Sequence, residues 1–223
     1  MQLVSRSCVT GAKPRHSDLT AILSLLASTF SQADLDEKQV SFTNTHFVTA
    51  NRWVAKKSSK IHSLNDLKGK TIVSTAGTTN IKQITEINAA QNLGMNIISA
   101  NGHPEAFQMM ATGRAAAFVM DDILLASLAA SSQTPNDYEI SKQGLSVEPY
   151  GIMLRKDDAA FKKVVDAAMT SIYKSGQINA IYSKWFEKPI PPKNINLHLP
   201  MSSAFKKVVA KPTSSGDPKD YSN

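Results

Sequence analysis

From residue 67 onward, short β-branched runs alternate with stretches of helical periodicity. Thr71–Val73 predicts a strand, and isoleucine at every third position predicts a helix over Thr79–Asn92. Asn96–Ala100 and Ala115–Met120 predict two further strands. Strands that alternate with helices over short connections are typical of a mainly parallel sheet covered by helices. The pattern therefore predicts an α/β lobe.

Further elements complete this pattern on either side of residue 146. A short helix is expected from Pro104 to Gly113, an apolar helix over 123–130, a long extended segment over 146–155, and amphipathic helices over 158–174 and 177–186. From Pro189 the chain is rich in Pro, Ser and Lys, which predicts an extended or loosely attached tail.

The composition and charge of the chain exclude several classes of function. The 223 residues carry a net charge of +7, but the basic residues are scattered in twos and threes and aromatic residues do not interleave with them. This favours a solvated surface over a nucleic-acid site. Cys8 is the only cysteine, which excludes a disulfide framework within the chain. No apolar run approaches the roughly 20 residues of a membrane-spanning helix.

The N-terminal segment supports two interpretations. The segment imitates a secretory signal, because basic residues within 1–18 are followed by the apolar stretch LTAILSLLASTF at 19–30 and then by small residues. The long leader and Asp18, directly before the apolar stretch, favour instead an amphipathic helix or an ill-fitting start left by truncation.

The junction Gly77-Thr78-Thr79 joins the first strand to its helix. The first N–H groups of a helix lack internal partners and its dipole is positive there, so an anion is favoured, and two hydroxyls add donors. The GxxxxGK[ST] and GxGxxG spacings are absent, which excludes a P-loop and a dinucleotide fingerprint. A plain N-cap threonine is the structural alternative.

Asp121 and His103 are expected at the same edge as Thr78. Each follows a strand, and ligands bind at the carboxyl ends of strands in open parallel sheets. A carboxylate suits an ammonium group, whereas hydroxyls and a helix start suit a carboxylate, so Asp121 and the Thr78 turn together describe an α-amino acid. The alternatives are helix capping for Asp121 or Asp122, and a surface loop for His103.

The sequence offers no nucleophile–base arrangement and no metal-ligand spacing. The five histidines lack HxxxH spacing and have no partner cysteines, so neither a metal nor another cofactor is expected. No GxSxG is present, and no serine is convincingly paired with a base. The pattern favours binding over catalysis.

Five blocks of the chain, in order, resemble a known family. They are LNDLKGKTIVSTAGTTN, NIISANGHPEAF, ATGRAAAFVMDDILLA, PYGIMLRKDD and KWFEKPIPPKNINL. They are similar to periplasmic amino-acid-binding proteins of bacterial ABC importers (type II, family 3), in particular the glutamate/aspartate-binding branch. The resemblance runs from about Lys38 to Leu199. It implies a monomer of two α/β lobes that closes over one amino acid and delivers it to membrane permease subunits.

The resemblance also implies roles for individual residues. Thr78 and Thr79 would hold a ligand carboxylate and Asp121 the α-ammonium, while His103 would meet the distal carboxylate of glutamate or aspartate. The other lobe would contribute Thr43, Thr45 and, as a weaker candidate, Arg52 on a crossing strand.

The same resemblance divides the chain into four parts. We expect an unmatched leader over 1–37, a remnant of the first lobe with the first crossing strand over 38–60, an intact second lobe over 61–148, and the second crossing strand, first-lobe helices and tail over 149–223. The crossings are expected near 47–57 and 149–156. The family implies a periplasmic location.

The first lobe departs from the family pattern. The family carries an arginine six residues before the position of Phe42, and Asp36 stands there. An acidic residue would repel a ligand carboxylate. The sequence therefore predicts an incomplete first lobe, either from a truncated or frame-disrupted gene product or in a shortened protein with a new leader. The other function hypotheses are a periplasmic dehydratase of a cyclic acid, with Glu148 as its base, and an inactive fragment.

Overall fold

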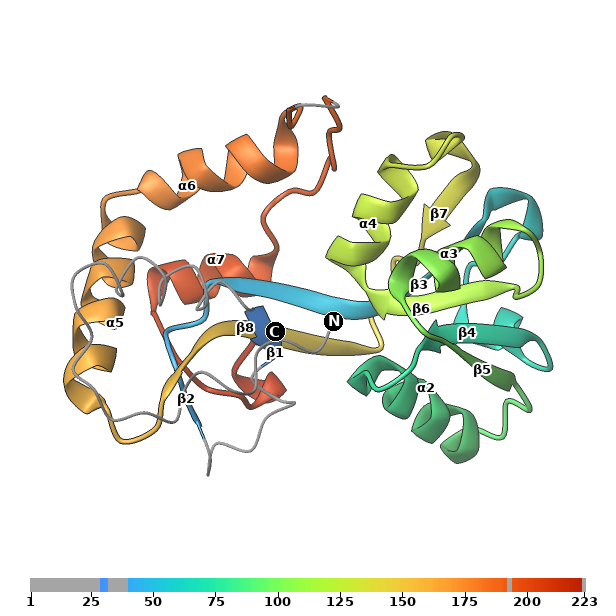
Figure 1. Ribbon diagram of the computed structural model, residues 1–223, viewed down its shortest axis with the longest axis horizontal. Coiled ribbons are helices and arrows are strands. Elements are labelled where there is room, and N and C mark those ends of the chain that lie inside the picture. Colours follow the sequence, from blue (N-terminus) through green and yellow to red (C-terminus); the bar gives the residue numbers. More distant parts are fainter. Residues whose placement is uncertain (1–28, 32–39, 192–193, 222–223) are drawn as a thin grey trace.

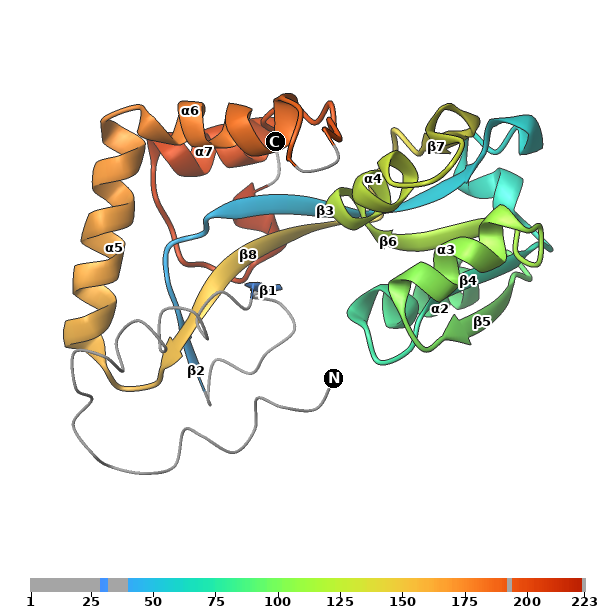
Figure 2. The ribbon, with the colours of Figure 1, turned by 45° about the horizontal axis from the view of Figure 1, so that its top comes forward.

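The computed structural model describes residues 29–31, 40–191 and 194–221. Two lobes are joined by two long strands, β3 (Phe47–Lys56) and β8 (Ser146–Arg155), which pair antiparallel (Figures 1 and 2). The path of hydrogen-bonded strands, β1-β8-β3-β6-β4-β5, runs through both lobes. The two-lobed α/β architecture expected from the sequence is confirmed.

The second lobe lies between the two crossing strands in sequence. In its sheet, β4 (Thr71–Thr75) lies parallel to both β5 (Asn96–Ala100) and β6 (Ala117–Asp121), and β6 pairs antiparallel with β3. The helices are α2 (Thr79–Ala90), α3 (His103–Ala111) and α4 (Asp122–Ala130). Short elements complete the lobe: η1 (Lys57–Ser59), η2 (Leu64–Leu67), η3 (Pro135–Asp137) and β7 (Tyr138–Ile140), which pairs with β3.

Side chains that alternate along the strands divide the second-lobe core into two layers. Ile72 and Val119 pack with Ile84 of α2 on one face of the sheet. Val73 and Phe118 pack with α3 and α4 on the other face. All five are fully buried, and each such side chain contributes about 1.5–3 kcal/mol relative to exposure. The helices are thereby held with their N-termini at one edge of the sheet.

The first lobe combines both ends of the described chain. Strands β1 (Thr29–Ser31) and β2 (Val40–Phe42) pair antiparallel with β8. The helices are α5 (Ala159–Lys174), α6 (Gln177–Tyr182), the π-helical turn η4 (Ser183–Glu187), α7 (Ser203–Ala210) and η5 (Pro218–Tyr221). Phe47 of β3, Phe205 of α7 and Tyr221 of η5 belong to its core. Within the described ranges, no helix is long and apolar enough to cross a bilayer.

The tail differs from the sequence prediction. Residues 203–210 form α7, whose N-cap Ser202 accepts a hydrogen bond from the Phe205 amide at 3.1 Å. Phe205, Val208 and Tyr221 are each at most 2% exposed. The prediction of an extended, loosely attached tail is therefore wrong for residues 203–210. That prediction rested on the overall polar composition, which does not reveal apolar side chains at helical spacing.

Several element boundaries also differ from the predictions. β6 runs from Ala117 to Asp121, so Asp121 is the last residue of the strand rather than the first residue after it. α3 begins at His103, one residue before the expected proline. The helix predicted over 177–186 changes to π-helical geometry at Ser183.

Candidate functional site

The turn at Thr78 is built by a left-handed glycine and an N-cap. Gly77 has φ +73°, which reverses the chain after β4 without the strain a side chain would bring. The Thr78 hydroxyl donates to the Thr75 carbonyl at 2.8 Å and accepts from the Ile81 amide at 3.4 Å. Thr79 begins α2. The turn thus presents the start of a twelve-residue helix at the carboxyl end of β4.

Asp121 is a buried carboxylate at the same edge. Its Oδ1 accepts from Asn80 Nδ2 at 2.9 Å, and its Oδ2 accepts from the hydroxyl of Tyr150 on β8. Asn80 is the second residue of α2, so this bond brings the Thr78 turn and Asp121 together. Burial raises the pKa of Asp121, and the nearby carboxylates of Glu148 and Asp122 raise it further. Such a carboxylate favours a cationic partner.

His103 is joined to the Thr78 turn through Thr75. The Thr75 hydroxyl and His103 Nδ1 are 2.7 Å apart, and Thr78 binds the carbonyl of the same threonine. A hydrogen bond at Nδ1 fixes the ring orientation and leaves Nε2 as the second polar atom. The structure thus links Thr78, His103 and Asp121 through Thr75 and Asn80, two residues that sequence reasoning missed. Thr75, as a polar residue at a strand end, carried the same signal as Asp121.

Arg52 lies on β3 and binds groups of the second lobe. Its Nε is 3.1 Å from Asp122 Oδ2, and its Nη1 donates to the Ser141 carbonyl at 2.7 Å and to the Lys142 carbonyl. The Thr49 hydroxyl donates to the other oxygen of Asp122 at 2.6 Å. The guanidinium is therefore already engaged, and its contact with a ligand stays a prediction.

Thr43 and Thr45 are fully buried, and their described contacts lie in the first lobe. The Thr43 hydroxyl donates to the Asn44 carbonyl at 2.9 Å and accepts from the Ile152 amide at 3.1 Å. The Thr45 hydroxyl is 2.7 Å from the hydroxyl of Tyr221 in η5. These contacts do not bring either threonine together with Asp121, so their ligand contacts also stay predictions.

Glu148 belongs to a buried polar cluster where the crossing strands meet α2. The carboxylate is 2% exposed, and its Oε1 accepts from Gln83 Nε2 at 2.7 Å and from the Ser146 hydroxyl at 2.6 Å. Gln83 Oε1 in turn accepts from Asn51 Nδ2 at 2.8 Å. Gln83, which sequence reasoning missed, thus fastens α2 to both crossing strands. Its exposed-face position in the helical pattern gave no signal.

Metal ligands do not gather in the described part of the chain. No group of three or more His, Cys, Asp or Glu side chains with metal-binding geometry is found in residues 29–31, 40–191 and 194–221. The chemistry of the edge is therefore that of one buried carboxylate, one histidine, hydroxyls and a helix start.

Comparison with known proteins shows the family of the chain. The model of the bacterial extracellular solute-binding proteins, family 3, matches residues 23–188. The chain belongs to this family. The resemblance found in the sequence is thereby confirmed, and this solute-binding protein has the type II periplasmic-binding fold.

Named relatives of this solute-binding protein come from several bacteria. It is 50% identical over 177 residues to the L-glutamate/L-aspartate-binding protein of Pseudomonas aeruginosa, covering 79% of this chain and 59% of that protein. It is 40% identical over 176 residues to a glutamate/aspartate import solute-binding protein of Escherichia coli, covering 79% and 58%. The chain thus spans less than two thirds of the length of these relatives.

Solved structures that match this chain share its fold but hold different ligands. An ancestral arginine-binding protein bound to arginine matches with a TM-score of 0.58 and 30% identity, over 67% of this chain and 66% of that one. The GluR0 ligand-binding core from Nostoc punctiforme in complex with L-glutamate matches with a TM-score of 0.57 and 26% identity, over the same shares. The fold therefore leaves the ligand side chain to be decided by the site.

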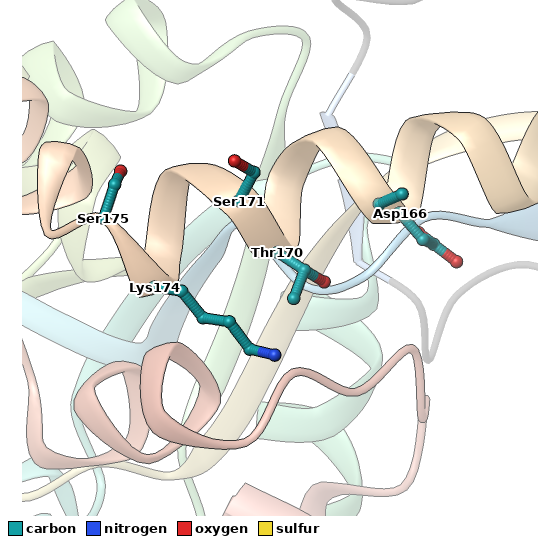
Figure 3. A pocket seen from close by; sticks show the side chains of 6 residues that line it. Asp166, Thr170, Ser171, Lys174 and Ser175 are labelled. Atoms are coloured by element: carbon teal, nitrogen blue, oxygen red, sulfur yellow. The ribbon is translucent and has the colours of Figure 1, made fainter.

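A separate pocket lies along α5 in the first lobe (Figure 3). It is an open concavity of about 640 Å³ lined by residues of α5 and its C-cap: Asp166, Ala167, Thr170, Ser171, Lys174 and Ser175. Asp166 binds the Asn44 amide and Lys162 Nζ, both at 2.7 Å. The pocket lies in the lobe opposite Asp121, and its one carboxylate already has a cation.

Proposed function

We propose that this solute-binding protein binds an acidic α-amino acid, glutamate or aspartate, at the second-lobe edge. The single observation that carries the proposal is the buried Asp121 carboxylate, 6% exposed, beside the start of α2 and linked to it by Asn80. A carboxylate and a helix N-terminus together match the ammonium and carboxylate of an α-amino acid.

The ligand groups have assigned partners. Asp121 accepts from the α-ammonium, and the first amides of α2 with Thr78 and Thr79 hold the α-carboxylate. His103 Nε2 meets the distal carboxylate while Thr75 holds Nδ1. The names of the glutamate/aspartate-binding relatives support the acidic side chain.

The proposed activity is binding of the amino acid rather than catalysis. Glu148, the candidate base for a dehydratase, is buried and accepts bonds from Gln83 and Ser146, which favours a structural carboxylate. The relatives' import function supports a periplasmic monomer that closes its lobes over the ligand and passes it to the permease subunits of an ABC importer.

Calorimetric titration with glutamate, aspartate, glutamine and histidine tests the proposal. The expected result is binding of glutamate or aspartate with a Kd on the order of 1 μM, equivalent to about −8 kcal/mol, and its loss in Asp121→Ala. The absence of heat with every amino acid, in a sample that unfolds cooperatively, would contradict it. Turnover of a cyclic acid would replace binding by catalysis.

A further inference from the structure

Tyr150 reaches from a crossing strand into the second-lobe site. It lies on β8, where it pairs with Phe47 of β3, and the two rings lie 6.1 Å apart between centroids. Its hydroxyl nevertheless donates to Asp121 at the end of β6. One hydrogen bond thus connects the strand that joins the lobes to the carboxylate assigned to the ligand ammonium.

The described hydrogen bonds to Asp121 come from neutral donors. Asn80 supplies an amide to one carboxylate oxygen and Tyr150 supplies a hydroxyl to the other. The one cation described near this point, Arg52, pairs with Asp122 instead. A buried carboxylate is costly unless donors surround it, and charged donors stabilise it most. The Tyr150 hydroxyl, as a neutral donor, therefore stabilises the Asp121 carboxylate less than the charged ammonium of a ligand would.

We propose that the Tyr150 hydroxyl is an internal stand-in for the ligand's α-ammonium, which holds Asp121 in the ligand-free protein and gives way when an amino acid binds. The proposal rests on the proposed function for the identity of the ligand. It makes Tyr150 a positioning residue that acts through Asp121. Ligand binding then breaks a contact between β8 and the second lobe, so occupancy of the site is coupled to the strand that joins the lobes.

Tyr150→Phe tests the proposal, because it removes the hydroxyl and keeps the ring on Phe47. The matched control is Tyr182→Phe, because in wild type the Tyr182 hydroxyl donates to the Pro200 carbonyl in the first lobe. In ligand-free protein, carbon NMR of labelled aspartate carboxyls should show that Tyr150→Phe raises the pKa of Asp121 and that the control does not. The other charged groups around Asp121, namely Glu148, Asp122 and Arg52, are unchanged in both variants.

The affinity for glutamate is the second quantity that tests the proposal. At pH 8, calorimetry should show binding to Tyr150→Phe about five- to tenfold tighter than to the wild type, because the ammonium no longer competes with the hydroxyl. The control should bind as the wild type does. In wild-type protein, the Cζ resonance of Tyr150 should move on ligand addition, which tests the same displacement without a substitution.

The failures of the two proposals are distinguishable. If wild type binds glutamate and Tyr150→Phe binds it equally or more weakly, the stand-in role is overturned and the proposed function stands. An unchanged pKa of Asp121 in Tyr150→Phe also overturns the stand-in role. If no amino acid binds either protein, the proposed function fails, and the stand-in role fails with it.

Discussion

Replacing Asp121 by asparagine should stabilise the ligand-free protein at neutral pH. The carboxylate is 6% exposed, and burial together with the charges of Glu148 and Asp122 raises its pKa. Asparagine has nearly the same shape and no charge. Its amide oxygen can still accept from Asn80, and its amide nitrogen can donate to the hydroxyl oxygen of Tyr150.

The size and the pH dependence of this effect follow from the burial. Among the described residues no cation pairs with Asp121, and removal of such a buried carboxylate is worth about 1–2 kcal/mol, which at roughly 2–4 °C per kcal/mol raises the Tm by roughly 2–8 °C. Because the folded state binds the Asp121 proton more tightly than the unfolded state, wild type loses stability as pH rises through the raised pKa. The advantage of the variant is therefore largest near pH 8 and shrinks toward the ordinary pKa of 3.8.

Urea denaturation followed by circular dichroism between pH 4 and pH 8 measures this difference. The control is Asp137→Asn, which removes an exposed carboxylate in η3 and should leave the free energy of unfolding within about 0.5 kcal/mol of wild type. An Asp121→Asn variant that is less stable than wild type at pH 7, or whose advantage does not change with pH, would refute the reasoning.

Three further predictions concern the core, the turn and the first lobe. Phe118→Ala, at a fully buried position between the sheet and α3 and α4, should lower the free energy of unfolding by about 3–5 kcal/mol in urea denaturation; a loss below 1 kcal/mol would argue against this packing. Thr78→Ala should cost about 1 kcal/mol through the lost cap at Ile81 and weaken glutamate binding in calorimetry, whereas Thr78→Ser should restore both. Burial lowers the pKa of His46 to about 4, so the contribution of His46 to stability should fall as pH drops from 6.5 toward 4. Between pH 7.5 and pH 5, this contribution should make the urea midpoint of wild type fall relative to that of His46→Gln, and it should leave the difference between wild type and the control His62→Gln, which alters an exposed side chain, unchanged.

Local patterns were sufficient to predict much of the second lobe. The isoleucine spacing in α2 reflects one buried helix face, and the continuous β-branched run of β4 reflects a strand buried on both faces of the sheet. Strand order then places Thr78, His103 and Asp121 at one edge, as expected. In the tail, the spacing of Phe205 and Val208 carried the signal for α7, but the surrounding prolines and serines obscured it.

The connections within the site could not be predicted in this way. Tyr150 meets Asp121 because β8, β3 and β6 pair in one register, with Asn51 opposite both Ser146 and Asp121. Register across a sheet depends on packing between distant segments rather than on the residues of one segment. Packing between distant segments also explains why the contact between the Thr45 and Tyr221 hydroxyls could not be predicted, whereas the ligand contact of Thr45 stays a prediction.

The central claim is that Asp121 holds the α-ammonium of the ligand. Calorimetric titration of wild type and Asp121→Asn with L-glutamate and with glutarate, which lacks the amino group, tests it most directly. The predicted result is that wild type prefers glutamate by about 30-fold or more, and that this preference disappears in Asp121→Asn. Equal binding of the two ligands by wild type, or a preference for glutamate that persists in Asp121→Asn, would contradict the claim.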